Sequence, residues 1–276
     1  MAIITLTTDF GLKDHFTGAV KGAILSELEN ARIVDISHNV SPFHITEAAY
    51  IIQNAYESFP KGTIHIIGID SERHAENEHI AVKLDGHFFI CANNGIISMM
   101  TRNMVPEEMV KINIHDRLST NFTVLDVFVK VACHIARGGT LGVIGKSISE
   151  IKEITGIMPV IHNDGRQIMG NVIYVDNYGN VITNITRKLF ESVAKGRAFK
   201  IAARTATFTK IYNRYSEAIN FNVEKEKRDE DGKKLALFNS SGYLELAIYK
   251  SNPSTVGSAS TLFGLDYRDA VSVYFE

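Results

Sequence analysis

The sequence predicts an α/β N-terminal domain, a layered α/β/α sandwich with a mostly parallel sheet, followed by an all-β C-terminal barrel. In the first half, β-branched apolar runs alternate with segments whose apolar residues recur every third or fourth position. After Met158-Pro159 the helical spacing becomes scarce and short β-like stretches follow one another. We therefore expect two domains, residues 1–158 and 159–276.

The first half supplies each element of the predicted sandwich in turn. Apolar residues every fourth position from Phe16 to Leu28 predict a helix, and the apolar run 63–69 is typical of a strand buried on both faces. Asp85-Gly86 joins two β-like runs as a hairpin. In chain order we expect strands at Ile3–Thr8, Arg32–Ser37, 63–69, His79–Leu84 and 87–91, with helices at 16–28, 48–56 and 126–136.

The second half predicts strands separated by polar turns. These strands are expected at Gln167–Val175, 180–185, 199–208, 235–238, Tyr243–Ile248 and 270–274. The segment 224–234 mixes acids and bases around Asp231-Gly232, which favours a solvated hairpin tip or loop.

Composition excludes several classes of protein. With a formal charge of −2, the chain creates no positive electrostatic field that would attract a polyanion, so we expect no nucleic-acid partner. No apolar stretch approaches the roughly 20 residues of a membrane span. The two cysteines, Cys91 and Cys133, lie in apolar runs, and no basic segment precedes the first strand, so we expect buried thiols in a cytoplasmic protein.

Two aspartates follow predicted strands, at the sheet edge where α/β proteins bind ligands. Asp9 ends the first strand, where its carboxylate either accepts hydrogen bonds from a ligand such as the vicinal hydroxyls of a ribose or caps the next helix. Asp70 ends the buried run 63–69 and is either a general base or a turn residue. His74, Glu78 and His79 match no metal motif, and we expect no metal site.

Amide-rich turns form a second group of candidates. Asn94 precedes Gly95, and Asp176 and Asn180 bracket a turn in the second half. Each is either a tight-turn residue or a contact to a nucleoside. Cys133-His134 is interpreted as a packed pair on a helix.

Several motifs, in a fixed order along nearly the whole chain, carry a family resemblance. They are TLTTDFG at 5–11, DISHNVSPF at 35–43, Asp70, ANNG at 92–95, VDNYGN at 175–180, NSSGYLELA at 239–247 and GSASTLFGL at 257–265. Together they resemble the S-adenosylmethionine (SAM) hydroxide adenosyltransferases, relatives of the fluorinases and chlorinases. The resemblance implies hydrolysis of SAM at ribose C5′ to adenosine and methionine, without cofactor or metal, by a homotrimer with sites at subunit interfaces.

The resemblance also implies roles for individual residues and for the domains. The first domain would bind substrate and carry out catalysis, and the second would complete the site. The implied substrate contacts are Asp9 with the ribose hydroxyls, Phe43 with the sugar and adenine, Asp14 and Asp176 with the ammonium, Ser240 with the carboxylate, Asn94 and Asn180 with the nucleoside, Phe122 in the pocket and the backbone of Ala259 with the adenine edge.

Two of the three water-activating positions depart from the family pattern. Asp70 is retained, but Asn77 stands where the family has Arg, and Thr123 stands where it has His. Arg73, His74 or His79 could substitute from the loop. The alternatives are a SAM- or adenosine-binding protein with weakened catalysis, and a halogenase. Halide transfer is disfavoured because fluorinases have Tyr where Asp70 stands, and a carboxylate there repels a halide by about 4 kcal/mol at 4 Å.

Overall fold

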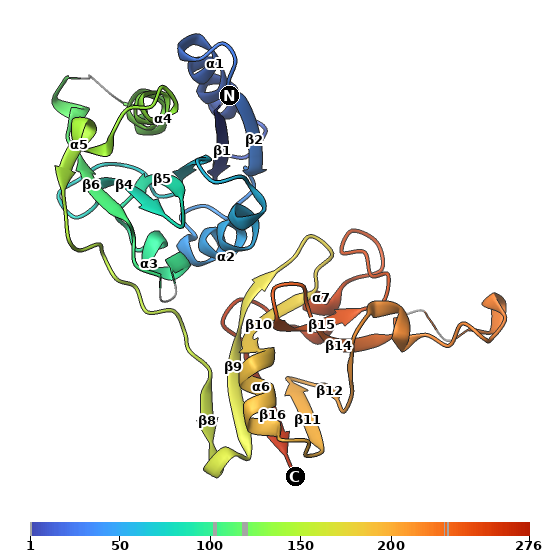
Figure 1. The fold of residues 1–276 in the computed structure, drawn as a ribbon. Coiled ribbons are helices and arrows are strands. Elements are labelled where there is room, and N and C mark those ends of the chain that lie inside the picture. The colour runs from blue at the N-terminus through green and yellow to red at the C-terminus, as the bar shows by residue number, and fades with distance from the viewer. Residues whose placement is uncertain (1, 102–103, 118–120, 229, 231) are drawn as a thin grey trace. The chain divides into compact units, whose positions relative to one another are not determined.

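The chain folds into two compact units, Met1–Gly156 and Ile157–Glu276. The computed structural model describes residues 2–101, 104–117, 121–228, 230 and 232–276. Figure 1 shows one sheet in each unit. No helix in the described part of the chain is long and apolar enough to cross a membrane.

The first unit is built on a mixed seven-stranded sheet. Its strands are β1 (Ile3–Thr8), β2 (Arg32–Ser37), β3 (Ile64–Gly68), β4 (His79–Leu84), β5 (His87–Ala92), β6 (Glu108–Ile112) and β7 (Gly145–Ser147), in the order β2-β1-β3-β5-β4-β6-β7. Strands β2, β1, β3 and β5 pair in parallel, whereas β5, β4, β6 and β7 pair antiparallel. The prediction of a mostly parallel sheet is therefore wrong.

The hairpin between β4 and β5 explains where the sheet changes direction. Asp85 and Gly86 both have positive φ, 48° and 72°, the pairing that a two-residue hairpin turn requires. The sequence predicted this hairpin, but it also takes β4 out of the parallel set. Strands β6 and β7, which the sequence did not predict, continue the antiparallel part.

Helices cover both faces of this sheet. They are α1 (Phe16–Glu27), α2 (Ile45–Ala55), α3 (Ile96–Thr101), α4 (Val129–Ala136) and α5 (Leu141–Ile144), with the 3₁₀ turns η1 (Tyr56–Ser58) and η2 (Ile114–Arg117) and the π-helical η3 (Val124–Phe128). Along β4, Ala81 belongs to the apolar cluster under α1 and α4, whereas Ile80 and Val82 belong to the cluster under α2 and α3. The sheet thus has an apolar core on each face (Figure 1).

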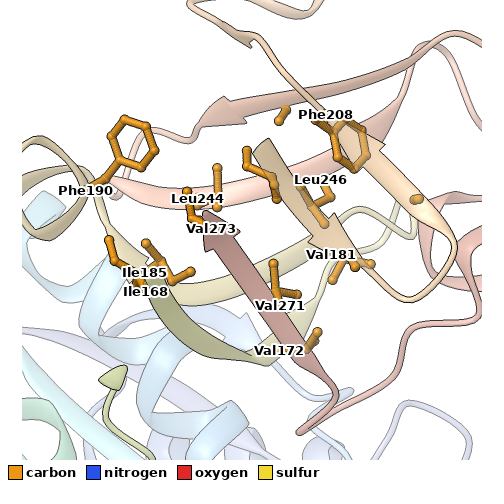
Figure 2. Close-up of a cluster of buried hydrophobic side chains, with 14 of the residues drawn as sticks. Ile168, Val172, Val181, Ile185, Phe190, Phe208, Leu244, Leu246, Val271 and Val273 are labelled. Carbon is orange, nitrogen blue, oxygen red and sulfur yellow. The ribbon is translucent and has the colours of Figure 1, made fainter. Parts of the chain in front are cut away.

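The second unit is a nine-stranded, barrel-like sheet. Its strands are β8 (Val160–His162), β9 (Gln167–Val175), β10 (Val181–Thr186), β11 (Phe199–Ala203), β12 (Ala206–Phe208), β13 (Ile211–Tyr212), β14 (Lys234–Phe238), β15 (Tyr243–Ile248) and β16 (Ala270–Phe275), in the order β12-β11-β16-β9-β10-β15-β14-β13, with β8 pairing β9. Figure 2 shows the side chains of β9, β10, β15 and β16 meeting in one apolar core.

The predicted barrel-like sheet is present in this unit, but the prediction of an all-β unit is only partly met, because two short α-helices accompany the sheet. They are α6 (Arg187–Ala194) and α7 (Ala259–Phe263), accompanied by the short turns η4 (Asn163–Gly165), η5 (Tyr215–Ala218) and η6 (Lys225–Lys227). The Thr186 side chain caps α6 by accepting from the backbone N–H of Leu189, and Phe190 packs into the core (Figure 2). Eight residues offer too few turns for helical periodicity to stand out from the neighbouring strands.

Candidate active site

The topology of the first sheet places two aspartates on either side of a switch point. Strand β1 lies between β2 and β3, so the chain leaves β1 on one side and returns to pair on the other. In open α/β sheets, ligands bind outside the carboxyl ends of strands at such a point. Asp9 follows β1 and Asp70 follows β3, which puts both acids at this edge.

The Asp9 carboxylate is partly buried and lies close to Asp70. Its Oδ2 accepts a hydrogen bond from the backbone N–H of Phe43 at 2.9 Å. Burial raises the pKa of Asp9, and the negative charge of Asp70 raises it further, against the lowering effect of backbone hydrogen bonds. Two acids of like charge at a sheet edge form a site that a cation would stabilise.

Phe43 is held in an unusual backbone conformation. Its φ is 62° and its side chain is 73% exposed, although most aromatic residues are largely buried and avoid the left-handed region. The hydrogen bond from its N–H to Asp9 fixes this turn, which leads directly into α2. Strain of about 1–3 kcal/mol of this kind is often kept at ligand sites. The structure thus joins Phe43 to Asp9, two residues 34 positions apart.

Asp70 also has positive φ, 45°, at the start of the turn from β3 to β4. Asp tolerates this conformation better than most residues. No residue that the structure describes donates a hydrogen bond to the Asp70 carboxylate or pairs with its charge. The carboxylate is thus available to bind and orient a small molecule.

Asn77 closes the turn that begins at Asp70. It is 3% exposed, and its Nδ2 donates to the carbonyl oxygens of Asp70 at 2.8 Å and of Glu72 at 2.9 Å. Its Oδ1 is buried without a partner among the described residues. Both amide hydrogens serve the backbone, so Asn77 shapes the turn and supplies no positive charge of the kind an Arg would bring.

Asn94 holds the same strand end from the neighbouring turn. Its Nδ2 donates to the Ile69 carbonyl at 3.1 Å, and its Oδ1 accepts from the N–H of Ile96 at 3.2 Å. The residue is buried. Asn94 therefore holds the backbone of Ile69, the residue before Asp70, and both polar atoms of its side-chain amide bond to the backbone.

Aromatic rings border the site beside Asp9. The rings of Phe10, Phe16 and Phe122 contact one another with centroid distances of 5.4–6.0 Å. Thr123 is half-buried at the start of η3, a π-helix of the kind often found at functional sites. Phe122 thus packs against Phe10, the residue that follows Asp9 in the sequence.

The remaining sequence candidates in this unit, all among the described residues, are not hydrogen-bonded to the carboxylate of Asp9 or Asp70. Asp14 is exposed in the segment before α1, and Thr123 directly precedes η3, which contacts the end of β3. Arg73 and His74 are exposed, and His74 Nδ1 accepts from the backbone N–H of Glu76 at 3.3 Å.

His79 is buried beside the turn, and both of its ring nitrogens are engaged. Its Nε2 lies 3.0 Å from the Ser71 carbonyl oxygen, and its Nδ1 lies 2.8 Å from Nε2 of His115. Burial, then the neighbouring His115, lowers the pKa of His79 to about 4. No local pattern pointed to His115, because it lies 36 residues away from His79 in the short 3₁₀ turn η2.

In the second unit, Asp176 organises the turn between β9 and β10. Its Oδ1 accepts from the backbone N–H groups of Tyr178 at 2.9 Å and Asn180 at 2.8 Å, and its Oδ2 accepts from Asn180 Nδ2 at 3.0 Å. This turn contacts α7, because Gly179 O accepts from the N–H of Ser260 at 2.9 Å. The predicted candidates Asp176, Asn180 and Ala259 thus come together, Ala259 as the first residue of α7.

Glu245 and Tyr215 form an acidic pair that sequence reasoning missed, in which Glu245 is 3% exposed and Tyr215 is 40% exposed. The Tyr215 hydroxyl donates to Glu245 Oε1 at 2.5 Å, and burial raises the pKa of both groups. The charge of Asp176 raises the pKa of Glu245 further. Glu245 lies on β15, directly after the turn that carries Ser240, which is exposed. A single Glu in an apolar strand was the only signal available.

Comparison with known protein families decides the assignment. Residues 4–145 match the SAM hydroxide adenosyltransferase N-terminal domain, and residues 170–272 match the C-terminal domain of the same family. The chain belongs to the SAM hydroxide adenosyltransferase family. The resemblance seen in the sequence is confirmed.

Three similar proteins cover between 72% and 99% of this chain. A protein of Methanocaldococcus jannaschii named (R)-S-adenosyl-L-methionine hydrolase is 29% identical over 99% of this chain and 96% of its own length. A fluorinase of Nocardia brasiliensis is 23% identical over 72% of this chain and 76% of its own length. The structure of an uncharacterised conserved protein of Thermotoga maritima matches with a TM-score of 0.81 and 25% identity, covering 99% of both chains.

The site of this family member offers no metal-binding cluster in the part of the chain that the structure describes. The two buried cysteines, Cys91 and Cys133, are free thiols, and burial raises the pKa of each. Neither thiol belongs to the group of site residues around Asp9 and Asp70.

Proposed function

We propose that this protein hydrolyses SAM to adenosine and methionine by attack of water or hydroxide at ribose C5′. The observation that carries the proposal is the pair of acids at the switch point, Asp9 beside Asp70. Family membership and the names of the relatives support the choice of substrate.

The charge of the site suits a sulfonium substrate. SAM carries a positive sulfur, and the pKa of Asp9 is raised by burial and by Asp70, so a cation nearby relieves the repulsion between the two acids. The Asp9 carboxylate has lone pairs beyond the one that accepts from the Phe43 N–H, and these can accept hydrogen bonds from the ribose hydroxyls. The exposed Phe43 ring offers a face on which the nucleoside can pack.

The reaction balances without a cofactor or a general acid. The water oxygen forms a bond to C5′, the C5′–S bond breaks, and its electron pair stays on sulfur, which leaves as the neutral thioether of methionine. One proton is released, and we assign its acceptance, or the orientation of the water, to Asp70. Positioning two reactants in line can contribute about 7–11 kcal/mol, so Asn77 and Thr123 need not act as catalytic groups.

Residues of the second unit, together with Asp14 of the first, complete the proposal. Asp176 and Asp14 would lie near the methionine ammonium, Ser240 near its carboxylate, Asn180 with the nucleoside and the backbone of Ala259 at the adenine edge. We also propose a cytoplasmic homotrimer with sites at subunit interfaces. Light scattering of the purified protein would test the assembly.

The decisive experiment follows the oxygen atom. Purified protein is incubated with SAM in H₂¹⁸O, using both sulfonium epimers because the relatives are named for the (R) form. The expected product is adenosine with ¹⁸O in its 5′-hydroxyl, in a molar ratio of one to methionine. No adenosine above a heat-inactivated control would contradict the proposal, and a 5′-halogenated nucleoside that depends on chloride or fluoride would replace it with halide transfer.

A second candidate is a SAM- or adenosine-binding protein with weakened catalysis. The observation that favours it is that Asn77 gives both amide hydrogens to the backbone and brings no positive charge. Calorimetry that shows tight SAM binding without adenosine formation would support this candidate.

A further inference from the structure

Three successive carbonyl groups of the Asp70 turn are held by the side chains of Asn77, two residues before β4, and His79, its first residue. Asn77 Nδ2 donates to the carbonyls of Asp70 and Glu72, and His79 Nε2 lies 3.0 Å from the carbonyl of Ser71 between them. His79 is the first residue of β4, which pairs with β5 on one side and β6 on the other. The turn is therefore fastened to a central part of the sheet.

The partners of His79 define which ring nitrogen carries its proton. A carbonyl oxygen can only accept, so Nε2 of His79 must be protonated to bond Ser71. Because burial keeps the ring neutral, Nδ1 is then an acceptor and must receive the N–H from Nε2 of His115. The hydrogen bonds thus run in one direction, from His115 to His79 to the Ser71 carbonyl.

The same arrangement leaves no free nitrogen on His79 for proton transfer. Its ring and that of Phe128 in η3 pack in a T-shaped arrangement, with centroids 4.9 Å apart and planes at 78°. Contacts on two ring nitrogens and on the ring itself hold the imidazole in place. A general base needs a lone pair that reaches the reacting water, and His79 directs its lone pair at His115.

We propose that His79, held by His115, is a positioning residue that fixes the Ser71 carbonyl and thereby the turn that carries Asp70. This inference rests on the proposed hydrolase function for its catalytic consequence. Asp70 has positive φ and its carboxylate lacks a partner among the described residues, so its position depends on the backbone of the turn. Loosening that backbone moves the carboxylate away from the water it orients.

Two variants separate the two hydrogen bonds of His79. His79→Gln places an N–H where Nε2 was and keeps the bond to Ser71, whereas His79→Asn places its oxygen where Nδ1 was and cannot reach Ser71. We expect His79→Gln to keep most of the wild-type kcat. We expect His79→Asn to lower kcat by about 100-fold with little change in KM, the cost of a misplacement of roughly 1 Å.

His65 provides a matched control in the same sheet. It is 1% exposed on β3, with Nδ1 at 2.7 Å from Thr5 Oγ1 and Nε2 at 3.2 Å from His87 Nδ1. His65→Asn should lower the melting temperature and leave kcat unchanged. An equal loss of kcat in His65→Asn and His79→Asn, or equal activity of the two His79 variants, would overturn the proposal.

Hydrogen exchange of the peptide covering residues 70–77 keeps this inference separate from the proposed function. We expect exchange to be faster in His79→Asn than in the wild-type protein, and nearly unchanged in His79→Gln. If the wild-type protein forms no adenosine, the proposed function fails, and the exchange comparison still decides whether His79 holds the turn. Identical exchange in both variants would refute the positioning role.

Discussion

The turns at Asp70 and at Asp176 both place an aspartate after a strand, yet they use the carboxylate in opposite ways. Asp176 accepts three hydrogen bonds from Tyr178 and Asn180, so its oxygens shape the backbone. In the Asp70 turn, Asn77 and His79 hold the backbone instead, and no described residue donates to the carboxylate. An acid is available for chemistry where other side chains do the work of shaping its turn.

The largest expected effect separates the two aspartates. Asp70→Asn should lower kcat by about 100-fold or more, since an amide cannot take a proton from water. Its stability should not fall, because Asn adopts positive φ at least as readily as Asp. Steady-state adenosine formation and urea unfolding measure the two quantities.

Asp176→Asn is the counterpart, and its expected effect is on stability. The amide nitrogen would face Asn180 Nδ2 in place of an acceptor, which should lower the free energy of unfolding by about 1–2 kcal/mol. If Asp70→Asn unfolded the protein while Asp176→Asn left its stability unchanged, the contrast between the two turns would be lost.

A second effect on stability comes from the glycine in the Asp176 turn, where φ is positive. Gly179 has φ of 72°, and an added Cβ would lie 2.2 Å from Ser258 of the α7 cap. Gly179→Ala should therefore lower the free energy of unfolding by about 2–4 kcal/mol, from backbone strain and overpacking together.

Gly196→Ala is the matched control in the same unit. Its φ is 80°, but nothing lies within 4 Å of the added Cβ, so the expected cost is the backbone term alone, about 1 kcal/mol. Urea unfolding of both variants gives the difference. Equal costs would show that the contact between the turn and α7 contributes little.

The sequence predicted where the acids lie but not how each is used. Strand ends follow from hydrophobic runs, so Asp9, Asp70 and Asp176 could be placed on turns from their neighbours alone. The backbone hydrogen bond from Phe43 to Asp9 and the contact of His79 with His115 join segments 34 and 36 residues apart. Such pairings depend on the packing of the sheet, and no local pattern encodes them.

The same limit explains the errors in the predicted fold. Alternation of strands and helices indicated a parallel sheet, but the β4–β5 hairpin turns the following strands antiparallel. Helix α6 spans only eight residues between strands, so its periodicity was hidden. The local spacing of apolar residues identified most helices and strands, whereas the pairing of the strands depends on how the whole chain folds.

The two units should also differ in how their stability depends on pH. In the first, burial, then the charge of His87, lowers the pKa of His65 to about 3, from 6.5 in the unfolded chain. Below pH 6.5 the unfolded state binds a proton that the folded state does not, so His65 should reduce stability by about 1.4 kcal/mol per pH unit as the pH falls. His65→Gln removes this term.

In the second unit the sign is reversed. Burial raises the pKa of Glu245, which is 3% exposed, above its unfolded value of 4.5. Above pH 4.5 the unfolded state releases a proton that the folded state retains, so the stabilising contribution of Glu245 declines as the pH rises through its folded pKa. Melting temperatures measured from pH 4.5 to 6.5 test both signs. Relative to the wild-type protein, the melting temperature of His65→Gln should rise less with increasing pH, and that of Glu245→Gln should rise more. A shift of both variants in the same direction would contradict the assignment, because only opposite signs follow from a histidine buried neutral and a carboxyl group that keeps its proton.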